Sequence, residues 1–389
     1  MKRIITAAIV FLLLTTTQAQ QKAVSEPVIV EIGNRYMIQS AILNEERNLL
    51  IHLPNGYENS EKKYPVIYVL DGNNHFQHAI NAATLLADNE RIPEGIIVAI
   101  PNNSGTRGRD LARMRDKFKQ FIKDEVIAFV EKNYRTTKHR TIFGHSMAGA
   151  FVLNYLATEP SLFDNYIAAS PVIQVLDSEL HDKFIDLFKT EKSLKKSLYF
   201  TLTDKIVEGE RATIALNKFV EILKNEAPES LDWKYSFIEN QIHMTTPYLT
   251  MYEGLSKVFA DYQSPRYSSY KDYKNRGGLK ALKTYYLNRA DKYQTSKEIP
   301  NSTLRRVAYI LLDDDQINMS INLFEENVKN NPQSAIAYKA LGDAYEENNE
   351  ITKALKVHQT AVELSKEQNS PDTNYFSRQL IRVQNKLEN

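Results

Sequence analysis

The sequence contains no cysteine among its 389 residues. This absence excludes disulfides, thiolate metal sites and lipid attachment at a lipoprotein cysteine. The net charge of +1 gives no indication of a nucleic-acid surface or a polyanionic partner. No apolar run reaches the roughly 20 residues that a membrane span needs. What is present is an ordinary globular composition, 42% hydrophobic and 25% charged, in a chain long enough for more than one domain.

The first 19 residues have the organisation of a secretory signal peptide. A basic start, Met1-Lys2-Arg3, precedes a short apolar stretch over residues 4–14, and small or polar residues follow up to Ala19. We therefore expect cleavage after Ala19 and an exported protein, periplasmic or secreted. The alternative is a buried N-terminal strand or helix.

The segment from residue 20 to residue 264 alternates strand-like and helix-like patterns. Unbroken apolar runs at 66–70 and 96–100 are typical of parallel strands that are covered on both faces. Further strands are expected at 28–30, 36–38, 49–54, 166–169, 198–202 and 234–238, and helical spacing of apolar residues covers 118–134. This alternation predicts an α/β fold with a doubly wound, mostly parallel sheet.

The stretch Phe143-Gly-His-Ser-Met-Ala-Gly149 has the form of a nucleophile elbow. A serine hydroxyl is a weak nucleophile, so it must stand exposed on a tight strand-to-helix turn where a base can take its proton. Gly144 relieves crowding on one side, and Ala148 stands where the common pattern has glycine. The N–H of Met147 would then face the developing oxyanion. Taken alone, the pattern also fits an ordinary strand-turn-helix.

His243 follows the last predicted strand in a polar loop, where the general base of such a site belongs. The chain order of serine, acid and histidine is that of α/β-hydrolases. Asp204, at the end of the 198–203 strand, is the first choice for the acid, with Glu208 and Glu210 in the following loop as alternatives. Each of the three also fits an exposed loop carboxylate.

A second oxyanion donor is expected in the loop after the 66–70 strand. The backbone N–H of Gly72 or Asn73 is suitably placed, although Gly72 also fits a simple turn residue. His75 is a candidate for substrate contact or for packing.

Together these motifs resemble the esterase family of α/β-hydrolases that includes esterase D-type enzymes, enterochelin esterases, feruloyl and acetylxylan esterases and mycolyltransferases. The matching stretches are Tyr64–Gly72, Val98–Asn102, Thr106–Leu111, Phe143–Gly149 and Phe163–Pro171. The resemblance implies ester hydrolysis through an acyl-enzyme. Because the sequence has no metal-ligand cluster and no phosphate-binding glycine loop, we expect no metal and no cofactor. In this scheme Ser146 attacks, His243 moves the proton, and Met147 and Asn73 donate N–H groups.

The resemblance also assigns Arg107 or Arg109 either to substrate positioning or to pairing with Asp110. One departure is the apolar segment Val172-Ile-Gln-Val175, where many relatives have aromatic residues. Because this loop borders the substrate pocket, the resemblance implies a small-molecule ester but does not specify which one. Two alternatives remain open: an acyltransferase with the same triad, and a catalytically silent hydrolase fold that binds a partner.

Residues 265–389 are predicted to form a separate helical domain. Shifting the sequence by 34 residues aligns Leu304, Val307, Ala308 and Leu311 with Tyr338, Leu341, Gly342 and Tyr345. The second set resembles a tetratricopeptide repeat, the first is a degenerate copy, and a final helix at about 375–387 would cap them. Such repeats suit a protein partner or self-association. The alternative is a plain helical tail.

Overall fold

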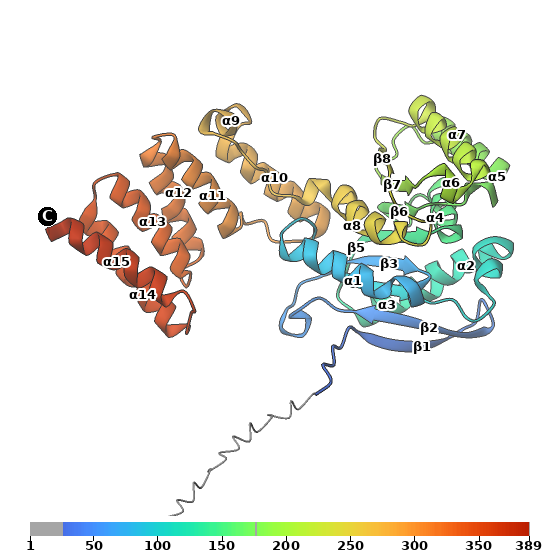
Figure 1. Cartoon of the computed structure of the whole chain (residues 1–389), viewed down its shortest axis with the longest axis horizontal. Coiled ribbons are helices and arrows are strands. Elements are labelled where there is room, and N and C mark those ends of the chain that lie inside the picture. Colours follow the sequence, from blue (N-terminus) through green and yellow to red (C-terminus); the bar gives the residue numbers. More distant parts are fainter. Residues whose placement is uncertain (1–25, 176, 389) are drawn as a thin grey trace, which may run out of the picture. The chain divides into compact units, whose positions relative to one another are not determined.

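The computed structural model describes residues 26–175 and 177–388, and the predicted signal peptide lies outside them. An eight-stranded sheet has the order β1-β2-β4-β3-β5-β6-β7-β8 (Figure 1). The strands are β1 (Asn34–Ser40), β2 (Glu45–His52), β3 (Tyr64–Leu70), β4 (Ile96–Ile100), β5 (Thr136–His145), β6 (Asn165–Ala169), β7 (Ser197–Leu202) and β8 (Asp232–Phe237). The pairs β1–β2 and β2–β4 are antiparallel, and the other neighbouring pairs are parallel. The predicted fold class is therefore confirmed. Of the three strands predicted at this edge, those near residues 36–38 and 49–54 are present as β1 and β2, whereas residues 28–30 form no strand.

The central strands are buried along their whole length, as their unbroken apolar runs predict. Every residue of β3, β4 and β6 is buried. Strand β1, at the edge, instead alternates exposed and partly buried residues. A strand buried on both faces requires helices on both sides of the sheet.

Helices cover both faces of this sheet. They are α1 (Gly72–Asp88), α2 (Arg115–Gln120), α3 (Ile127–Asn133), α4 (Met147–Thr158), α5 (Asp177–Thr190), α6 (Lys205–Glu208), α7 (Glu210–Glu226) and α8 (Thr246–Val258). On β6, Tyr166 and Ala168 belong to the core that includes residues of α4, whereas Ile167 contacts α8 at Gly254. Successive side chains of a strand point to opposite faces, so α4 and α8 lie on opposite sides. Helix α1 packs with α8, and α5 packs with α4 and α7.

The remainder of the chain is helical. Its helices are α9 (Tyr270–Asn275), α10 (Gly278–Tyr293), α11 (Asn301–Asp313), α12 (Ile317–Asn330), α13 (Ala335–Glu347), α14 (Ile351–Glu367) and α15 (Thr373–Glu388). From α11 to α15 each helix packs against the next (Figure 1). Among the described residues, no helix combines the length and apolar character that a bilayer crossing requires.

These helices recur with the spacing that the sequence predicts. Helices α11 and α13 begin at Asn301 and Ala335, which are 34 residues apart, and α12 and α14 begin at Ile317 and Ile351, also 34 apart. The turns inside the two pairs match as well, because Asp315 has a φ of 58° and so does Asn349. The tetratricopeptide-like character of these two pairs nevertheless stays a prediction.

Candidate active site

Ser146 occupies the sharp turn between β5 and α4, with φ 61° and ψ −118°. A non-glycine residue at positive φ is strained and persists only when its surroundings hold it. Here the Ser146 N–H donates to the carbonyl of Ala169 at 2.9 Å, and the Ser146 carbonyl accepts from the N–H groups of Ala150 and Val172 at 3.0 and 3.1 Å. The serine is thus fixed by its own backbone, and it is only partly buried.

The glycines around the serine are required by close backbone contacts. A Cβ on Gly144 would lie 2.3 Å from the carbonyl oxygen of Ala148, and one on Gly149 would lie 3.1 Å from that of Ala169. Ala148 itself is fully buried. Helix α4 therefore approaches β6 and the segment after it most closely at Gly149. The common pattern has its glycine one position earlier, where this chain has Ala148.

His243 pairs with Glu208, the last residue of α6. His243 Nδ1 and Glu208 Oε2 are 2.6 Å apart, and the two side chains are 26% and 2% exposed. Burial opposes ionisation of Glu208, but the hydrogen bond from His243 and the nearby Ser170 hydroxyl outweigh it and hold the pKa of the carboxyl below its usual value. An ionised Glu208 can only accept, so Nδ1 carries the proton. This leaves Nε2 of His243 free to act as a base.

The structure places Glu208, rather than the preferred Asp204, against His243, and the identity of the acid stays a prediction. Asp204 is exposed and caps α6, since its Oδ1 accepts from the N–H of Ile206 at 2.8 Å. Glu210 pairs on the surface with Lys205 at 2.9 Å. The single turn of α6 carries the chain back so that Glu208 meets the histidine. An aspartate just after a strand is a frequent helix N-cap, and that signal was available in the sequence.

His145, the residue before Ser146, bonds to the loop that carries His243. Its Nε2 donates to the carbonyl of His243 at 2.9 Å, and the two rings are 4.7 Å apart. Burial and the neighbouring His243 lower the pKa of His145 to about 4, so the ring is neutral near pH 7. Thr246 Oγ1 donates to the same carbonyl at 3.0 Å. This contact was not predicted from the sequence, because the middle position of the Gly-x-Ser motif accepts many residue types.

His75 and His78 extend the histidine cluster away from the serine. His75 Nδ1 lies 3.1 Å from His78 Nε2, and the His75 ring contacts His145 edge-on at 5.6 Å. Burial, with a smaller contribution from His78, lowers the pKa of His75 to about 4. Only 4% of His75 is exposed. Of the two roles considered for His75, the structure supports packing.

Gly72 and Asn73 begin α1, directly after β3, at the same edge of the sheet as Ser146. Gly72 is buried, and a Cβ there would lie 2.9 Å from the backbone nitrogens of Ile100 and Pro101. Asn73 is exposed, and its Oδ1 accepts from the N–H of Asn102 at 3.3 Å. Met147 begins α4 on the other side of the site. Backbone donors from two helix N-termini therefore flank the serine loop.

Arg107 and Arg109 are both held in ion pairs. Arg107 makes two bonds of 2.8 Å to Asp71, the residue before α1, and a third of 3.2 Å to the carbonyl of His145. It therefore ties the α1 loop to the strand that carries the serine. Arg109 bonds Glu45 at 2.6 and 2.9 Å and Asp110 at 2.8 Å. Pairing of Arg109 with Asp110 was one of the two expected options.

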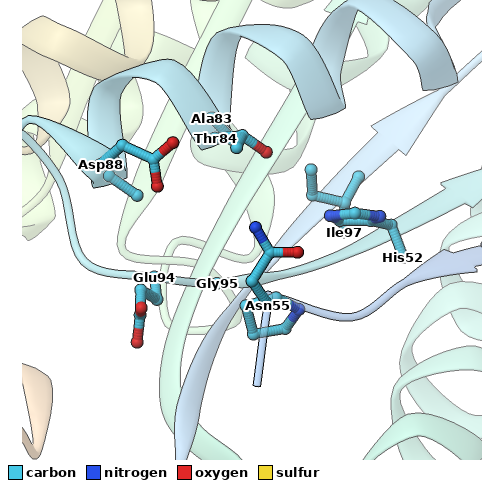
Figure 2. Close-up of a pocket in the computed structure, with 10 residues that line it drawn as sticks. His52, Asn55, Ala83, Thr84, Asp88, Glu94, Gly95 and Ile97 are labelled. Carbon is cyan, nitrogen blue, oxygen red and sulfur yellow. The ribbon is translucent and has the colours of Figure 1, made fainter. Parts of the chain in front are cut away.

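The pocket in Figure 2 is separate from this site. It lies at the start of β4 and the end of α1, and its lining includes Asn55, Asp88 and Glu94. Its volume of about 30 Å³ accommodates about one water molecule, which is too small for an ester substrate.

Residues 40–219 match the family described as "Putative esterase". The matched segment contains Ser146 and Glu208, whereas His243 lies beyond its end. This part of the chain is therefore similar to the esterase family.

Several curated relatives are named as esterases. Ferri-bacillibactin esterase BesA of Bacillus subtilis is 34% identical over 142 residues, which cover 28% of this chain and 48% of that protein. The siderophore triacetylfusarinine C esterase of Aspergillus fumigatus is 33% identical over 129 residues, 28% of this chain and 44% of that protein. The chain thus spans about half the length of the curated relatives it matches.

Solved structures share the fold. An IroE-like serine hydrolase from Shewanella oneidensis aligns with a TM-score of 0.59 and 22% identity, over 77% of this chain and 99% of that one. An uncharacterised protein from Capnocytophaga ochracea aligns with a TM-score of 0.61 and 16% identity, over 90% of this chain and 99% of that one. This chain shares the hydrolase fold with the Shewanella protein. The alignment with the Capnocytophaga protein extends into the helical C-terminal region.

Proposed function

We propose that this protein is a serine esterase that hydrolyses carboxylic esters through an acyl-enzyme. The observation that supports this most directly is the hydrogen bond from His243 Nδ1 to the buried, ionised Glu208, which leaves Nε2 as a base. The strained backbone of Ser146 at the end of β5 adds the nucleophile.

The proposed reaction proceeds in two halves. Ser146 Oγ attacks the ester carbonyl carbon and gives its proton to His243 Nε2, while N–H groups of Met147 and of Gly72 or Asn73 stabilise the oxyanion. Collapse of this intermediate breaks the bond to the alcohol, which leaves with the proton from His243. Water then attacks the acyl-enzyme, His243 takes its proton, and the acid departs as Ser146 recovers its hydrogen. Glu208 stays ionised throughout and stabilises the protonated imidazole.

Siderophore esters are our first candidates for the natural substrate. One relative is named a ferri-bacillibactin esterase and another a siderophore triacetylfusarinine C esterase, and they are 34% and 33% identical to this chain over the aligned residues. We also propose that the enzyme is exported by the segment 1–19, and that α11–α14 are two tetratricopeptide-like repeats, capped by α15, that bind a protein partner or a second copy.

Hydrolysis of p-nitrophenyl acetate by the purified protein tests the mechanism. The Ser146→Ala and His243→Ala variants should lose about three orders of magnitude or more in kcat while keeping the melting temperature of the wild type. A fluorophosphonate probe should label the wild type but not Ser146→Ala. A wild type that neither turns over the ester nor reacts with the probe would favour the silent binding protein. Ester products formed with an added alcohol would favour the acyltransferase.

A further inference from the structure

A second pocket, larger than the one in Figure 2, lies where α10 meets the start of β3. It has a volume of about 360 Å³. Its walls come from residues 62–65, from the segment before β4 that includes Ile92 and Pro93, from Tyr262, and from Arg289 and residues 294–296. The candidate active site lies at the other end of β3, whose seven residues span roughly 20 Å. The two sites are therefore distinct.

Arg289 is the unusual feature of this pocket. The residue is only 7% exposed, yet it forms no ion pair with any residue that the structure describes. Its guanidinium lies over the rings of Tyr262 and Tyr286, 4.5 and 4.3 Å from their centroids, and its hydrogen bond to the carbonyl of Tyr262 is long at 3.4 Å. It also interacts with the hydroxyl of Tyr285. Its Nε atom has no hydrogen-bond partner among the described residues. Buried charges in proteins are normally paired, because an unpaired one loses its hydration without compensation.

A second polar group in the lining also lacks a partner. The hydroxyl of Thr295 is buried and makes no hydrogen bond within the described part of the chain. The other charges of the lining are Lys62, Lys63, Glu90 and Glu94. Glu94 pairs with Lys62 at 3.3 Å, and Glu90 accepts from Ser302 at 2.9 Å. The lining has three cationic and two anionic side chains, so it carries an excess of one positive charge.

We propose that this pocket binds a small organic carboxylate. Its carboxylate would accept hydrogen bonds from Arg289 and Thr295, and its apolar part would pack against Pro65, Ile92, Pro93 and Tyr262. The single excess charge favours a monoanion, and the apolar walls favour a carbon skeleton over inorganic phosphate. A bound ligand would contact both the sheet and α10, and would therefore stabilise the attachment of α10 to the hydrolase fold.

Binding of benzoate, measured by calorimetry and by the shift in melting temperature, tests the proposal. The Ser146→Ala variant serves as the parent protein, so that the result does not depend on the proposed esterase reaction. Benzamide is the neutral isostere, and inorganic phosphate is the alternative anion. We expect benzoate to bind and to raise the melting temperature, and the other two probes to bind at least about tenfold more weakly.

Three variants locate the site. Arg289→Gln removes the charge and should weaken benzoate binding at least about tenfold. Ala87→Phe leaves Arg289 intact but fills the pocket that Ala87 lines, and it should have the same effect even if Arg289→Gln folds poorly. Arg276→Gln is the matched control, because Arg276 also lies over a tyrosine ring, 4.7 Å from the centroid of Tyr267, but is exposed and outside the pocket.

Three results would overturn the proposal. The first is that neither benzoate nor phosphate binds at concentrations up to about 10 mM. The second is that benzamide or phosphate binds as tightly as benzoate. The third is that benzoate binding survives both Arg289→Gln and Ala87→Phe.

Discussion

Two histidine–glutamate pairs in this molecule have the same chemistry and opposite surroundings. In the hydrolase fold, His243 and Glu208 are 2.6 Å apart, and the histidine side chain is 26% exposed. In the helical region, His358 Nε2 and Glu346 Oε1 are 3.3 Å apart, and the histidine side chain is 1% exposed. The surroundings of the two histidines therefore decide which of them could accept a proton from a substrate.

The carboxylates differ in their other partners. Glu346 also bonds Arg382 and Lys386, two cations of the last helix. Its charge therefore serves to fasten α15 to α13. Burial lowers the pKa of His358, and its Nδ1 has no partner among the described residues. A buried, neutral histidine whose second nitrogen meets no solvent has no proton to exchange with a substrate.

The same cluster has metal-ligand geometry without being a convincing metal site. Asp343, Glu346 and His358 bring three ligand atoms within 4.8 Å of one another. However, Asp343 is already bonded to Lys339 and Tyr309, each at 2.6 Å. Because cations of the chain already neutralise both carboxylates, the cluster is better explained as a structural link between helices.

The largest difference between the two pairs is expected when each glutamate is replaced by glutamine. Glu208→Gln should lower kcat by about 10³- to 10⁴-fold, because the neutral amide can neither hold the Nδ1 proton in place nor stabilise the imidazolium. Glu346→Gln should leave kcat unchanged and cost about 1 kcal/mol of stability, since its cations are half exposed. Initial rates with a p-nitrophenyl ester and urea unfolding check both. Equal losses of kcat in the two variants would contradict the different roles of Glu208 and Glu346.

Substitutions at two tightly packed glycines, Gly144 and Gly342, compare the packing of the same two regions. Gly144→Ala would press a methyl group against the backbone of Ala148, and Gly342→Ala would press one against His358 Nε2, at 2.3 and 2.4 Å. Both changes should cost about 1–3 kcal/mol. Only Gly144→Ala should also abolish esterase activity, because it displaces the turn of Ser146. Loss of activity in a folded Gly342→Ala variant would contradict the separation of the two regions.

Acid should weaken the hydrolase fold through its histidine cluster. The pKa values of His75, His78 and His145 are lowered from 6.5 to about 4, chiefly by burial. Between these values the unfolded chain binds protons that the folded chain does not, so stability falls as the pH drops from 6.5 towards 4. The lowered pKa of Glu208 removes further stability only below the ordinary value of 4.5.

Each pKa unit corresponds to about 1.4 kcal/mol, and solvent screening reduces this, so we expect a total loss of a few kcal/mol. Urea unfolding at a series of pH values measures it. The double variant His75→Asn/His78→Asn should lose less stability over this range than the wild type. An unchanged pH dependence in that variant would show that the cluster does not account for the loss.

The smallest effect is expected at Asp204. Asp204→Ala removes the N-cap of α6, a single exposed turn, and should cost roughly 0.5–1 kcal/mol. Its kcat should fall less than about tenfold, because Glu208 stays within reach of His243. If Asp204→Ala instead lost as much activity as Glu208→Gln, Asp204 would be the acid after all.

Local sequence was sufficient for the parts of the site that are local in space. The unbroken apolar runs predicted the buried parallel strands, and the residues from Gly144 to Gly149 predicted the turn at Ser146. A strand buried on both faces requires apolar residues along its length, and a strained turn requires small residues beside it. Likewise, the 34-residue shift predicted the spacing of α11–α14 before any contact was known.

The remainder was decided by contacts between residues far apart in the chain. Sequence alone determined that a serine, a histidine and one of three carboxylates lie at the carboxyl edge of a parallel sheet, because strand ends gather there whatever the loops do. Only the tertiary structure selected Glu208, because the choice depends on which carboxylate the turn of α6 buries against His243. The bonds from His145 to His243 and from Arg107 to Asp71 are of the same kind. Their distances and burial arise from the packing of separate elements, which no local pattern encodes.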